Sequence, residues 1–327
     1  MALFDLPLES LRDYVPDVAE PDDFDVFWSD TLAQTRDEAQ RTQVEAVDTG
    51  LRLVRTSDVT FSGFGGDPIR GWWHVPADGT LRGVVVEFLG YSGGRGLPHE
   101  VGNWVLAGYG HLVMDTRGQG WHHTRPGATA DPHGSGPAAP GKMTHGIADP
   151  ATYYYRRVFA DAVRAIETAR GLAPGAPLFV TGGSQGGGIA IAATALAASV
   201  DVDVTGALPD VPFLCNFPRA TTITDAMPYR EIANHLAAHR GEETQVYRTL
   251  SYFDGVAFAR RARVPALFSV ALMDVICPPS TVFSAYNVWG SPDRSIEVYP
   301  FNDHEGGGQF QRRAQLDWMA ARLHETS

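Results

Sequence analysis

The chain has 327 residues, enough to bury a substantial core, and its hydrophobic and charged fractions are those of an ordinary globular protein. The 26 basic and 38 acidic side chains give a formal net charge of −12, which disfavours nucleic acid and anionic membranes as partners. Residues 1–17 show no basic region of a secretory signal, and the longest apolar stretch, 189–200, is too short to span a bilayer. Cys215 and Cys277 form no disulfide or zinc-ligand pattern, so we expect a reduced, cytoplasmic protein whose thiols serve packing.

The first half of the chain predicts mostly strands. Apolar residues at helical spacing after Pro21 indicate an amphipathic helix, and alternating apolar and polar residues further on indicate antiparallel strands. Nearly continuous apolar runs then indicate buried strands, and a stretch rich in glycine, proline and histidine indicates a long loop. In chain order, these elements are the helix after Pro21, the antiparallel strands 51–61 and 69–76, the buried strands 83–89 and 111–114, and the loop 121–151.

In the second half strands alternate with helices, a pattern typical of a mostly parallel, doubly wound sheet. Residues 210–262 interrupt the alternation with polar helical segments, and we interpret them as a helical insertion near the active face. With residues 1–45 as an amino-terminal helical extension, the whole chain, 1–327, is expected to form one α/β domain. The elements of this half are the helix 152–171, the strand 177–181, the helix 185–199, the strands 203–208 and 266–273, the helix 279–289, the strand 295–299 and a final helix from 309.

The most informative motif is Gly182-Gly183-Ser184-Gln185-Gly186, which lies between an apolar run and a helical stretch. It is the G-x-S-x-G pattern, in which a sharp strand-to-helix turn exposes a serine hydroxyl for attack on an acyl carbon. Gly182 and Gly186 fit the same turn, because a side chain beside the strained serine would clash with the neighbouring strand and helix. The motif predicts Ser184 as the nucleophile of an esterase or a relative.

Two other interpretations fit the same glycines. Thr181, Gly182, Gly186 and Gly188 also match the glycine-rich turn of a dinucleotide-binding dehydrogenase, and a tight strand–helix crossing without chemistry would use glycine as well. The dehydrogenase interpretation is disfavoured because several strands precede the motif, and because the sole lysine, Lys142, lies upstream rather than in a downstream Tyr-x-x-x-Lys. The scarcity of lysine also excludes a G-x-x-x-x-G-K-[ST] phosphate loop.

A serine nucleophile needs a base, and the base needs an orienting acid, which follow the serine in the order acid, then histidine, in this kind of fold. His304 lies in a glycine-rich loop after the last expected strand and is the predicted base; the alternative is a loop histidine that caps the last helix. Asp274 follows the strand 266–273, and catalytic groups gather at the carboxyl ends of parallel strands. It is the predicted acid, and the alternative is a turn aspartate bonded to its own backbone.

The negative oxygen of a tetrahedral intermediate needs backbone donors. One is the N–H group that follows the nucleophile, which belongs to Gln185. The loop after the third strand supplies the other in this kind of fold, and in the glycine-rich loop 90–96 we predict the Tyr91 N–H. A plain tight turn is the alternative interpretation of this loop.

Candidate metal ligands occur in the long loop. His122, His123, Asp131 and His133 lie there, but their spacing matches no pattern of metal ligands. The serine mechanism itself needs no metal. We therefore expect neither a metal nor an organic cofactor.

With these residues placed, the chain resembles carbohydrate esterase family seven, the acetyl xylan esterases and cephalosporin C deacetylases. Three motifs occur in the family's order: Arg117-Gly118-Gln119-Gly120, Gly182-Gly183-Ser184-Gln185-Gly186 and His304-Glu305. Further similar stretches make the resemblance cover nearly the whole chain; they are 90–91, 95–99, 149–170, 210–215 and 280–286.

The resemblance implies an α/β-hydrolase fold in which Ser184, Asp274 and His304 form a catalytic triad. The amides of Tyr91 and Gln185 would form the oxyanion hole. It also implies cofactor-free hydrolysis of acetyl esters of small sugars, xylo-oligosaccharides and cephalosporin C. The assembly that it implies is a ring-shaped homo-hexamer whose active sites face an internal cavity. A related peptidase or thioesterase with a different acyl preference is the alternative function, and a hydrolase-like binding protein without turnover is a third.

The family motifs also imply supporting residues. Arg117 and Gln119 would fix loops near the serine. The chain departs from the family pattern at Asp303, where the family has asparagine, and the extra carboxylate beside His304 is a reason to expect an altered pH profile. Residues 121–135, at the expected edge of the pocket, depart from the family pattern as well.

Overall fold

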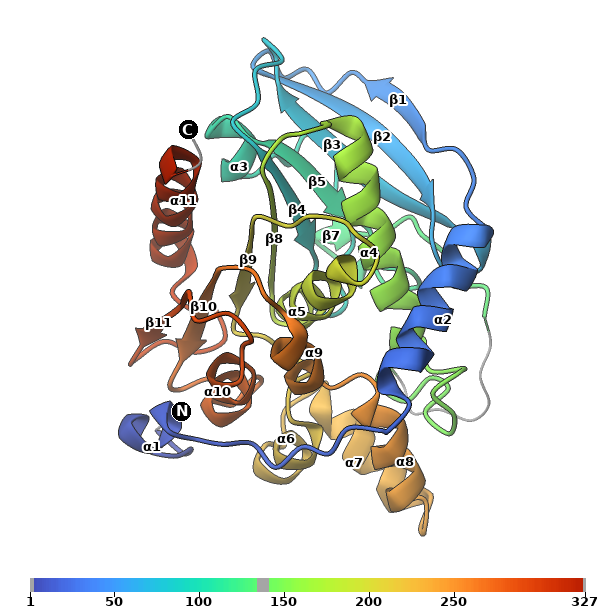
Figure 1. Ribbon diagram of the computed structural model, residues 1–327, viewed down its shortest axis with the longest axis vertical. Coiled ribbons are helices and arrows are strands. Elements are labelled where there is room, and N and C mark those ends of the chain that lie inside the picture. Colours follow the sequence, from blue (N-terminus) through green and yellow to red (C-terminus); the bar gives the residue numbers. More distant parts are fainter. Residues whose placement is uncertain (1–2, 134–140, 326–327) are drawn as a thin grey trace.

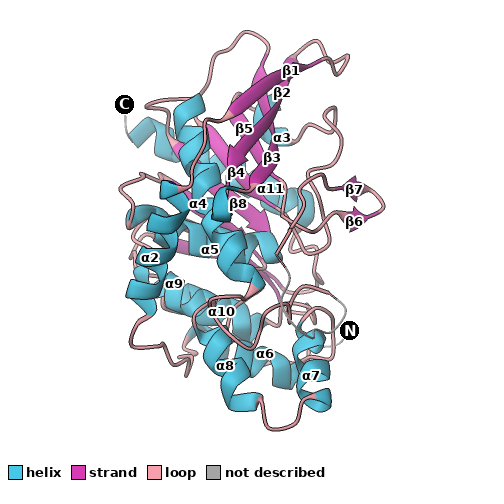
Figure 2. Ribbon diagram, turned by 90° about the vertical axis from the view of Figure 1, so that its right-hand side faces the viewer, coloured by secondary structure: helices cyan, strands magenta, loops and turns pink. Residues whose placement is uncertain are grey.

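The structure, a computed structural model, describes residues 3–133 and 141–325. These residues form a nine-stranded sheet with helices on both faces and a small separate hairpin (Figures 1 and 2). The hairpin pairs β6 (Trp121–His122) with β7 (Arg125–Pro126). In sheet order, the other strands are β1 (Gln43–Val47), β2 (Val54–Ser62), β3 (Pro68–Pro76), β5 (Gly110–Met114), β4 (Val84–Phe88), β8 (Leu178–Gly183), β9 (Gly206–Asp210), β10 (Ala266–Ala271) and β11 (Arg294–Tyr299).

The sheet is antiparallel at one edge and parallel elsewhere. The pairs from β1 through β2 and β3 to β5 are antiparallel. The pairs from β5 through β4, β8, β9 and β10 to β11 are parallel. This confirms the predicted mostly parallel, doubly wound sheet. The strand order reverses between β4 and β8, and open α/β sheets bind ligands at such a point, beyond the carboxyl ends of the strands.

Helices cover both faces of the sheet. One face carries α4, α5, α9 and α10, with α2 outside α4, and the other carries α3 and α11 (Figure 1). In chain order the helices are α1 (Leu8–Arg12), α2 (Phe24–Asp37), the short 3-10 helix η1 (Phe64–Gly66), α3 (Asn103–Leu106), α4 (Tyr154–Leu172), α5 (Gln185–Ala198), α6 (Phe217–Ile223), α7 (Tyr229–Ala238), α8 (Glu243–Ser251), α9 (Gly255–Arg261), α10 (Pro279–Asn287) and α11 (Gly308–Glu325). Among the described helices, none combines the length and hydropathy needed to cross a membrane.

The central strands are buried on both faces, which explains their continuous apolar sequences. Val84 and Val86 of β4 belong to the larger core, together with residues of α4 and α5. Val85 points the other way and packs with Phe179 of β8 in a second core that also includes residues from α3 and α11. Because successive strand residues alternate between faces, both helix layers pack against β4 and β8, and this holds the ends of these two strands in place.

Several short elements were not predicted. The edge strand β1 is mostly exposed, and its short alternation of Val44 and Ala46 with polar residues begins inside the segment 1–45 that was expected to be helical. The hairpin of β6 and β7, also exposed, lies inside the expected long loop 121–151. Helix α3 has only four residues. Within the expected insertion 210–262, the last helix, α9, packs on α5 and α10.

His74 on β3 gives the folded state a pH dependence. Burial lowers the pKa of His74 from 6.5 to about 3, and the neighbouring His111 adds to the effect. The unfolded chain takes up this proton near pH 6.5, whereas the folded chain takes it up only near pH 3. The stability that comes from the neutral folded imidazole is therefore present above pH 6.5 and is lost as the pH falls toward 3.

We expect wild type to lose about 2 kcal/mol more unfolding free energy than His74→Gln between pH 7 and pH 5. Urea denaturation at the two pH values measures this difference. Asp210 and Asp254 act in the opposite direction, because burial raises the pKa of each carboxyl to about 6. Both aspartates are present in the two proteins, so their contribution cancels in the comparison. An equal loss in wild type and variant would contradict the prediction.

Candidate active site

Ser184 occupies a strained turn between β8 and α5. Its backbone angles are φ 58° and ψ −121°, a combination that residues other than glycine rarely adopt. Hydrogen bonds hold the turn on both sides: the Ser184 N–H donates to the Asp210 carbonyl oxygen at 3.0 Å, and the Ser184 carbonyl oxygen accepts from the Phe213 N–H at 2.9 Å. The predicted nucleophile therefore lies at the carboxyl end of a central strand, next to the point where the strand order reverses.

The glycines of the motif are required by close backbone contacts. A Cβ at Gly182 would lie 2.3 Å from the Gly186 carbonyl carbon, and a Cβ at Gly186 would lie 2.1 Å from the Phe88 carbonyl oxygen. A Cβ at Gly183 would meet nothing within 4 Å. The structure thus explains why Gly182 and Gly186 are fixed in the pattern while position 183 is variable.

Gly186→Ala is expected to lower the free energy of unfolding by about 3 kcal/mol, because the obstructing atom is backbone at the end of β4 and cannot rotate away. Gly183→Ala is the matched control, since the same substitution three residues earlier enters open space. Chemical denaturation of both variants measures the difference. The steric account would be wrong if the two variants were equally stable.

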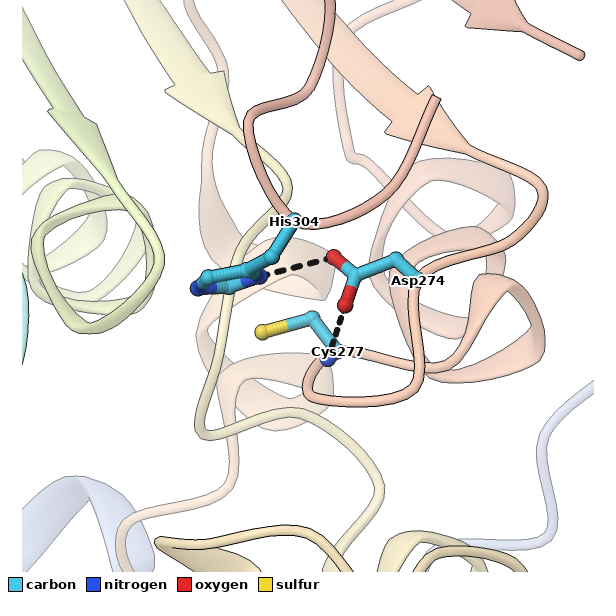
Figure 3. A group of neighbouring side chains, drawn as sticks. All are labelled: Asp274, Cys277 and His304. Carbon is cyan, nitrogen blue, oxygen red and sulfur yellow. Dashed lines mark hydrogen bonds and ion pairs between the residues drawn. The ribbon is translucent and has the colours of Figure 1, made fainter. Parts of the chain in front are cut away.

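The predicted acid and base are hydrogen-bonded to each other (Figure 3). His304 Nδ1 lies 2.8 Å from Asp274 Oδ2. The other oxygen, Asp274 Oδ1, accepts the backbone N–H groups of Ile276 at 2.8 Å and Cys277 at 2.9 Å. The Asp274 side chain is fully buried, whereas 27% of the His304 side chain is exposed. The backbone thus orients the carboxylate, and the carboxylate orients an imidazole that reaches the surface.

The sheet brings this pair together. β10 and β11 are parallel neighbours, so the loops that follow them and carry Asp274 and His304 emerge side by side. Asp303 lies beside the pair, but its Oδ1 accepts the backbone N–H of His304 at 2.9 Å. Asp303 therefore contacts the backbone of His304, while the His304 ring contacts Asp274.

Ser184 and His304 line one cavity of about 380 Å³, together with Gly90 at the end of β4. Cys277 is buried beside them: ligand atoms of Asp274, Cys277 and His304 all lie within 4.8 Å of one another. Burial raises the pKa of the Cys277 thiol, and a hydrogen bond with Ser184 acts against this rise. The sequence interpretation of Cys277 as a packing residue missed that it contacts the serine.

Gln119 links the two segments that carry the predicted oxyanion donors. It lies in the loop after β5, where its Oε1 accepts the Ser92 N–H at 2.8 Å. Its Nε2 donates to Gln185 Oε1, also at 2.8 Å. Tyr91 and Gln185 are the candidate donors, so this single side chain connects the loop after β4 to the residue that follows Ser184.

Arg117 lies in the loop after β5, as Gln119 does, and its side chain is fully buried. It forms two hydrogen bonds to Asp161 of α4, at 2.6 and 2.8 Å, and a third to Asp67 at 2.8 Å. Its Nη2 also donates to the Phe64 carbonyl oxygen at 3.2 Å. These partners lie in α4 and in the turn after β2, so Arg117 positions the loop that carries Gln119.

The histidines of the long loop do not form a ligand group within the described residues. The rings of His122 and His123 stack on each other with centroids 4.7 Å apart. His133 Nε2 lies 2.7 Å from Asp67, and Asp131 pairs with Arg157. Within the same part of the chain, the group of side chains with metal-ligand spacing is the one around Asp274 described above.

One contact of the candidate oxyanion loop could not be expected from the sequence. The Tyr91 hydroxyl donates a hydrogen bond to Glu231, which lies 140 positions away on α7. Neither residue belongs to a motif that mentions the other, and Glu231 resembles any other acidic residue in a polar helix. Only the folded chain brings the two together.

Comparison with known proteins identifies the family. The family model for acetyl xylan esterase (AXE1) matches residues 1–322. The chain belongs to the acetyl xylan esterase family. A member from Paenibacillus sp. R4 is 38% identical, with a TM-score of 0.87 over 97% of this chain and 99% of that structure. Acetyl xylan esterase 1 from Thermoanaerobacterium sp. JW/SL YS485 is 29% identical, with a TM-score of 0.87 over 99% and 100%.

The acetyl esterase Axe7A of Xylanibacter ruminicola is 29% identical over 171 residues, which are 50% of this chain. The chain covers only 36% of the length of that relative. Membership of the acetyl xylan esterase family confirms the predicted α/β-hydrolase fold and the enzyme class, carboxylic ester hydrolase.

Proposed function

We propose that the protein is a serine esterase that removes acetyl groups from small acetylated sugars, xylo-oligosaccharides and cephalosporin C. The observation that carries this proposal is the hydrogen-bonded pair of Asp274 and His304, whose imidazole lines one cavity with Ser184. The names of the similar proteins support the preference for acetyl esters. Cephalosporin C is proposed on the family resemblance alone.

In the proposed reaction His304 takes the proton of the Ser184 hydroxyl, and the serine oxygen attacks the acetyl carbonyl carbon. The carbonyl oxygen becomes an oxyanion that accepts hydrogen bonds from the Gln185 and Tyr91 amides. His304 then donates its proton to the sugar oxygen, the ester bond breaks, and the sugar leaves. A water molecule repeats the sequence on the acetyl-serine and releases acetate.

Local geometry suits these roles. Asp274 Oδ2 faces His304 Nδ1, which favours the tautomer that carries its proton on Nδ1 and keeps Nε2 free to act as a base. Ser184 directly precedes α5, a helix of 14 residues, so the positive end of the helix dipole lies where negative charge develops. Asp274 also stabilises the imidazolium that forms during the reaction.

Comparison of acyl substrates tests the proposed function. We expect kcat/KM to be highest for p-nitrophenyl acetate and to fall for the butyrate and octanoate. Release of acetate from acetylated xylo-oligosaccharides and from cephalosporin C should follow. A higher kcat/KM for long acyl chains, acyl thioesters or acyl-peptide anilides would favour the alternative peptidase or thioesterase function instead.

We also propose a homo-oligomer, with the hexamer suggested by the family resemblance, and a cytoplasmic location. Phe301 and Phe310 are 82% and 83% exposed, and self-association would cover such side chains. Cys215 and Cys277 are both free, buried thiols, as in a reducing compartment. Sedimentation velocity tests the assembly, and cell fractionation tests the location.

A further inference from the structure

Contacts outside its own loop hold Tyr91, the proposed oxyanion residue. Its hydroxyl group donates a hydrogen bond to Glu231 Oε1 at 2.8 Å and accepts one from the Lys142 backbone N–H. The Tyr91 ring also lies edge-on to Trp121, with the ring centroids 5.7 Å apart. The position of residue 91 therefore depends on α7 and on the loop at 142 as well as on β4.

The Glu231 side chain is buried against the loop 141–143. It projects from α7 and is 5% exposed. While Oε1 accepts from Tyr91, its other oxygen, Oε2, accepts the Met143 N–H at 3.0 Å. A Cβ at Gly141 would lie 2.2 Å from both carboxylate oxygens, so the carboxylate occupies the space that a side chain there would need. The loop 141–143 is wrapped around the Glu231 carboxylate.

The pKa shifts of the two side chains indicate which of them donates the proton in this hydrogen bond. Burial raises the pKa of Glu231, and hydrogen bonds from Met143, Tyr91 and Lys142 act against this rise. Burial and the nearby carboxylate both raise the pKa of Tyr91, so its phenol keeps the proton and donates it to Glu231. A hydrogen bond to a carboxylate is stronger than one between neutral groups. The network therefore restrains the Tyr91 ring more than packing alone would.

We propose that Glu231 is a positioning residue, which acts through Tyr91 to place the Tyr91 backbone N–H opposite the carbonyl oxygen of the bound ester. The inference rests on the proposed function, in which that N–H stabilises the oxyanion. The contacts that hold this part of the loop include the hydrogen bond that the Tyr91 hydroxyl donates to Glu231 and the one that the Ser92 N–H donates to Gln119. An oxyanion donor works only within a narrow range of distances, so a shift of the loop by about 1 Å would cost activity.

The test measures kcat, KM and inhibitor affinity for Glu231→Ala. We expect kcat for p-nitrophenyl acetate to fall on the order of 10²-fold, with KM changed by less than about threefold. Affinity for a small alkylboronic acid, which forms a tetrahedral adduct with the serine, should fall by a similar factor. A purely structural role would lower Tm without this selective loss. An unchanged kcat, or a rise in KM alone, would overturn the proposal.

Two further variants keep the test decisive. Glu231→Gln preserves the shape of the side chain if the alanine variant does not fold, and it should show an intermediate loss, because its amide cannot accept from Met143 and Tyr91 with both terminal atoms. Tyr91→Phe removes the other partner of the contact. Combining Tyr91→Phe with Glu231→Ala should cost less than the product of the two single losses, because both substitutions remove the same hydrogen bond between Tyr91 and Glu231. Multiplicative losses in the double variant would overturn the proposal.

A matched control is Glu242→Ala, which removes an exposed carboxylate that pairs with His235 in the same helical region. It should keep wild-type kcat and KM, and a loss as large as that of Glu231→Ala would overturn the proposal. Ser184→Ala, measured in parallel, separates the two levels of inference. Full activity without the hydroxyl would refute the proposed function itself, whereas an inactive Ser184→Ala beside a fully active Glu231→Ala would refute only the positioning role.

Discussion

Replacing Ser184 by alanine is expected to lower kcat for p-nitrophenyl acetate by about 10⁴-fold or more. The substitution removes the proposed attacking atom and little else. The turn itself is held by backbone hydrogen bonds to Asp210 and Phe213, which alanine retains. Steady-state kinetics together with thermal denaturation check this prediction, and Tm should stay close to that of wild type.

The matched control for this variant is Ser199→Ala at the other end of α5. The Ser199 hydroxyl donates to the Leu196 carbonyl oxygen at 2.7 Å, as an ordinary helix-end serine does. Its loss should leave kcat and KM unchanged. Activity that survives in Ser184→Ala, with the fold intact, would mean that another group carries the acyl transfer.

Asp274→Asn is expected to lower kcat by about 10⁴-fold, even though it changes a single oxygen to nitrogen. The N–H groups of Ile276 and Cys277 require an acceptor, so the amide oxygen of the new side chain would face them. Its NH₂ group would then point at His304 Nδ1, which must become an acceptor. The imidazole proton would move to Nε2, and the nitrogen meant to act as base would be occupied.

Asp303→Asn is the matched control, because the same change is made in an exposed carboxylate next to the same histidine. That side chain accepts the His304 backbone N–H, and an amide oxygen can do the same. The activity of Asp303→Asn at neutral pH should stay near that of wild type. Profiles of kcat/KM against pH for both variants check the distinction, and equal losses would refute the assigned role of Asp274.

The parts of the site that could be predicted from the sequence were those with a local physical signature. The turn at Ser184 needs glycine at positions 182 and 186 because backbone atoms approach closely there. Both glycines lie two residues from the serine, so the requirement is visible as a short motif. Asp274 follows an apolar run, and His304 follows a segment in which Ile296 and Val298 alternate with polar residues, so their places after strands could be inferred from the sequence pattern. The mostly parallel sheet followed from the alternation of strands and helices.

Other features depend on contacts between distant segments and could not be predicted in this way. Glu231 gains its environment only when α7 folds against the loop 141–143. Cys277 follows Asp274 by three residues, but its contact with Ser184 depends on how two separate turns meet. The strand β1 alternates Val44 and Ala46 with polar residues over only five exposed positions, and such a short segment does not indicate its pairing with β2.

The order of strands divides the site between two places in the sheet. The turn of Ser184 and the loop of Tyr91 follow β8 and β4 in the middle, whereas Asp274 and His304 follow β10 and β11, and β11 is the outermost strand. Edges of sheets open more readily than centres. Local opening of β11 would separate the His304 imidazole from the Ser184 hydroxyl while most of the molecule stays native. During synthesis, the segments that carry Tyr91 and Ser184 emerge first. They stay inactive until the final quarter of the polypeptide, which carries Asp274 and His304, has emerged and folded against them.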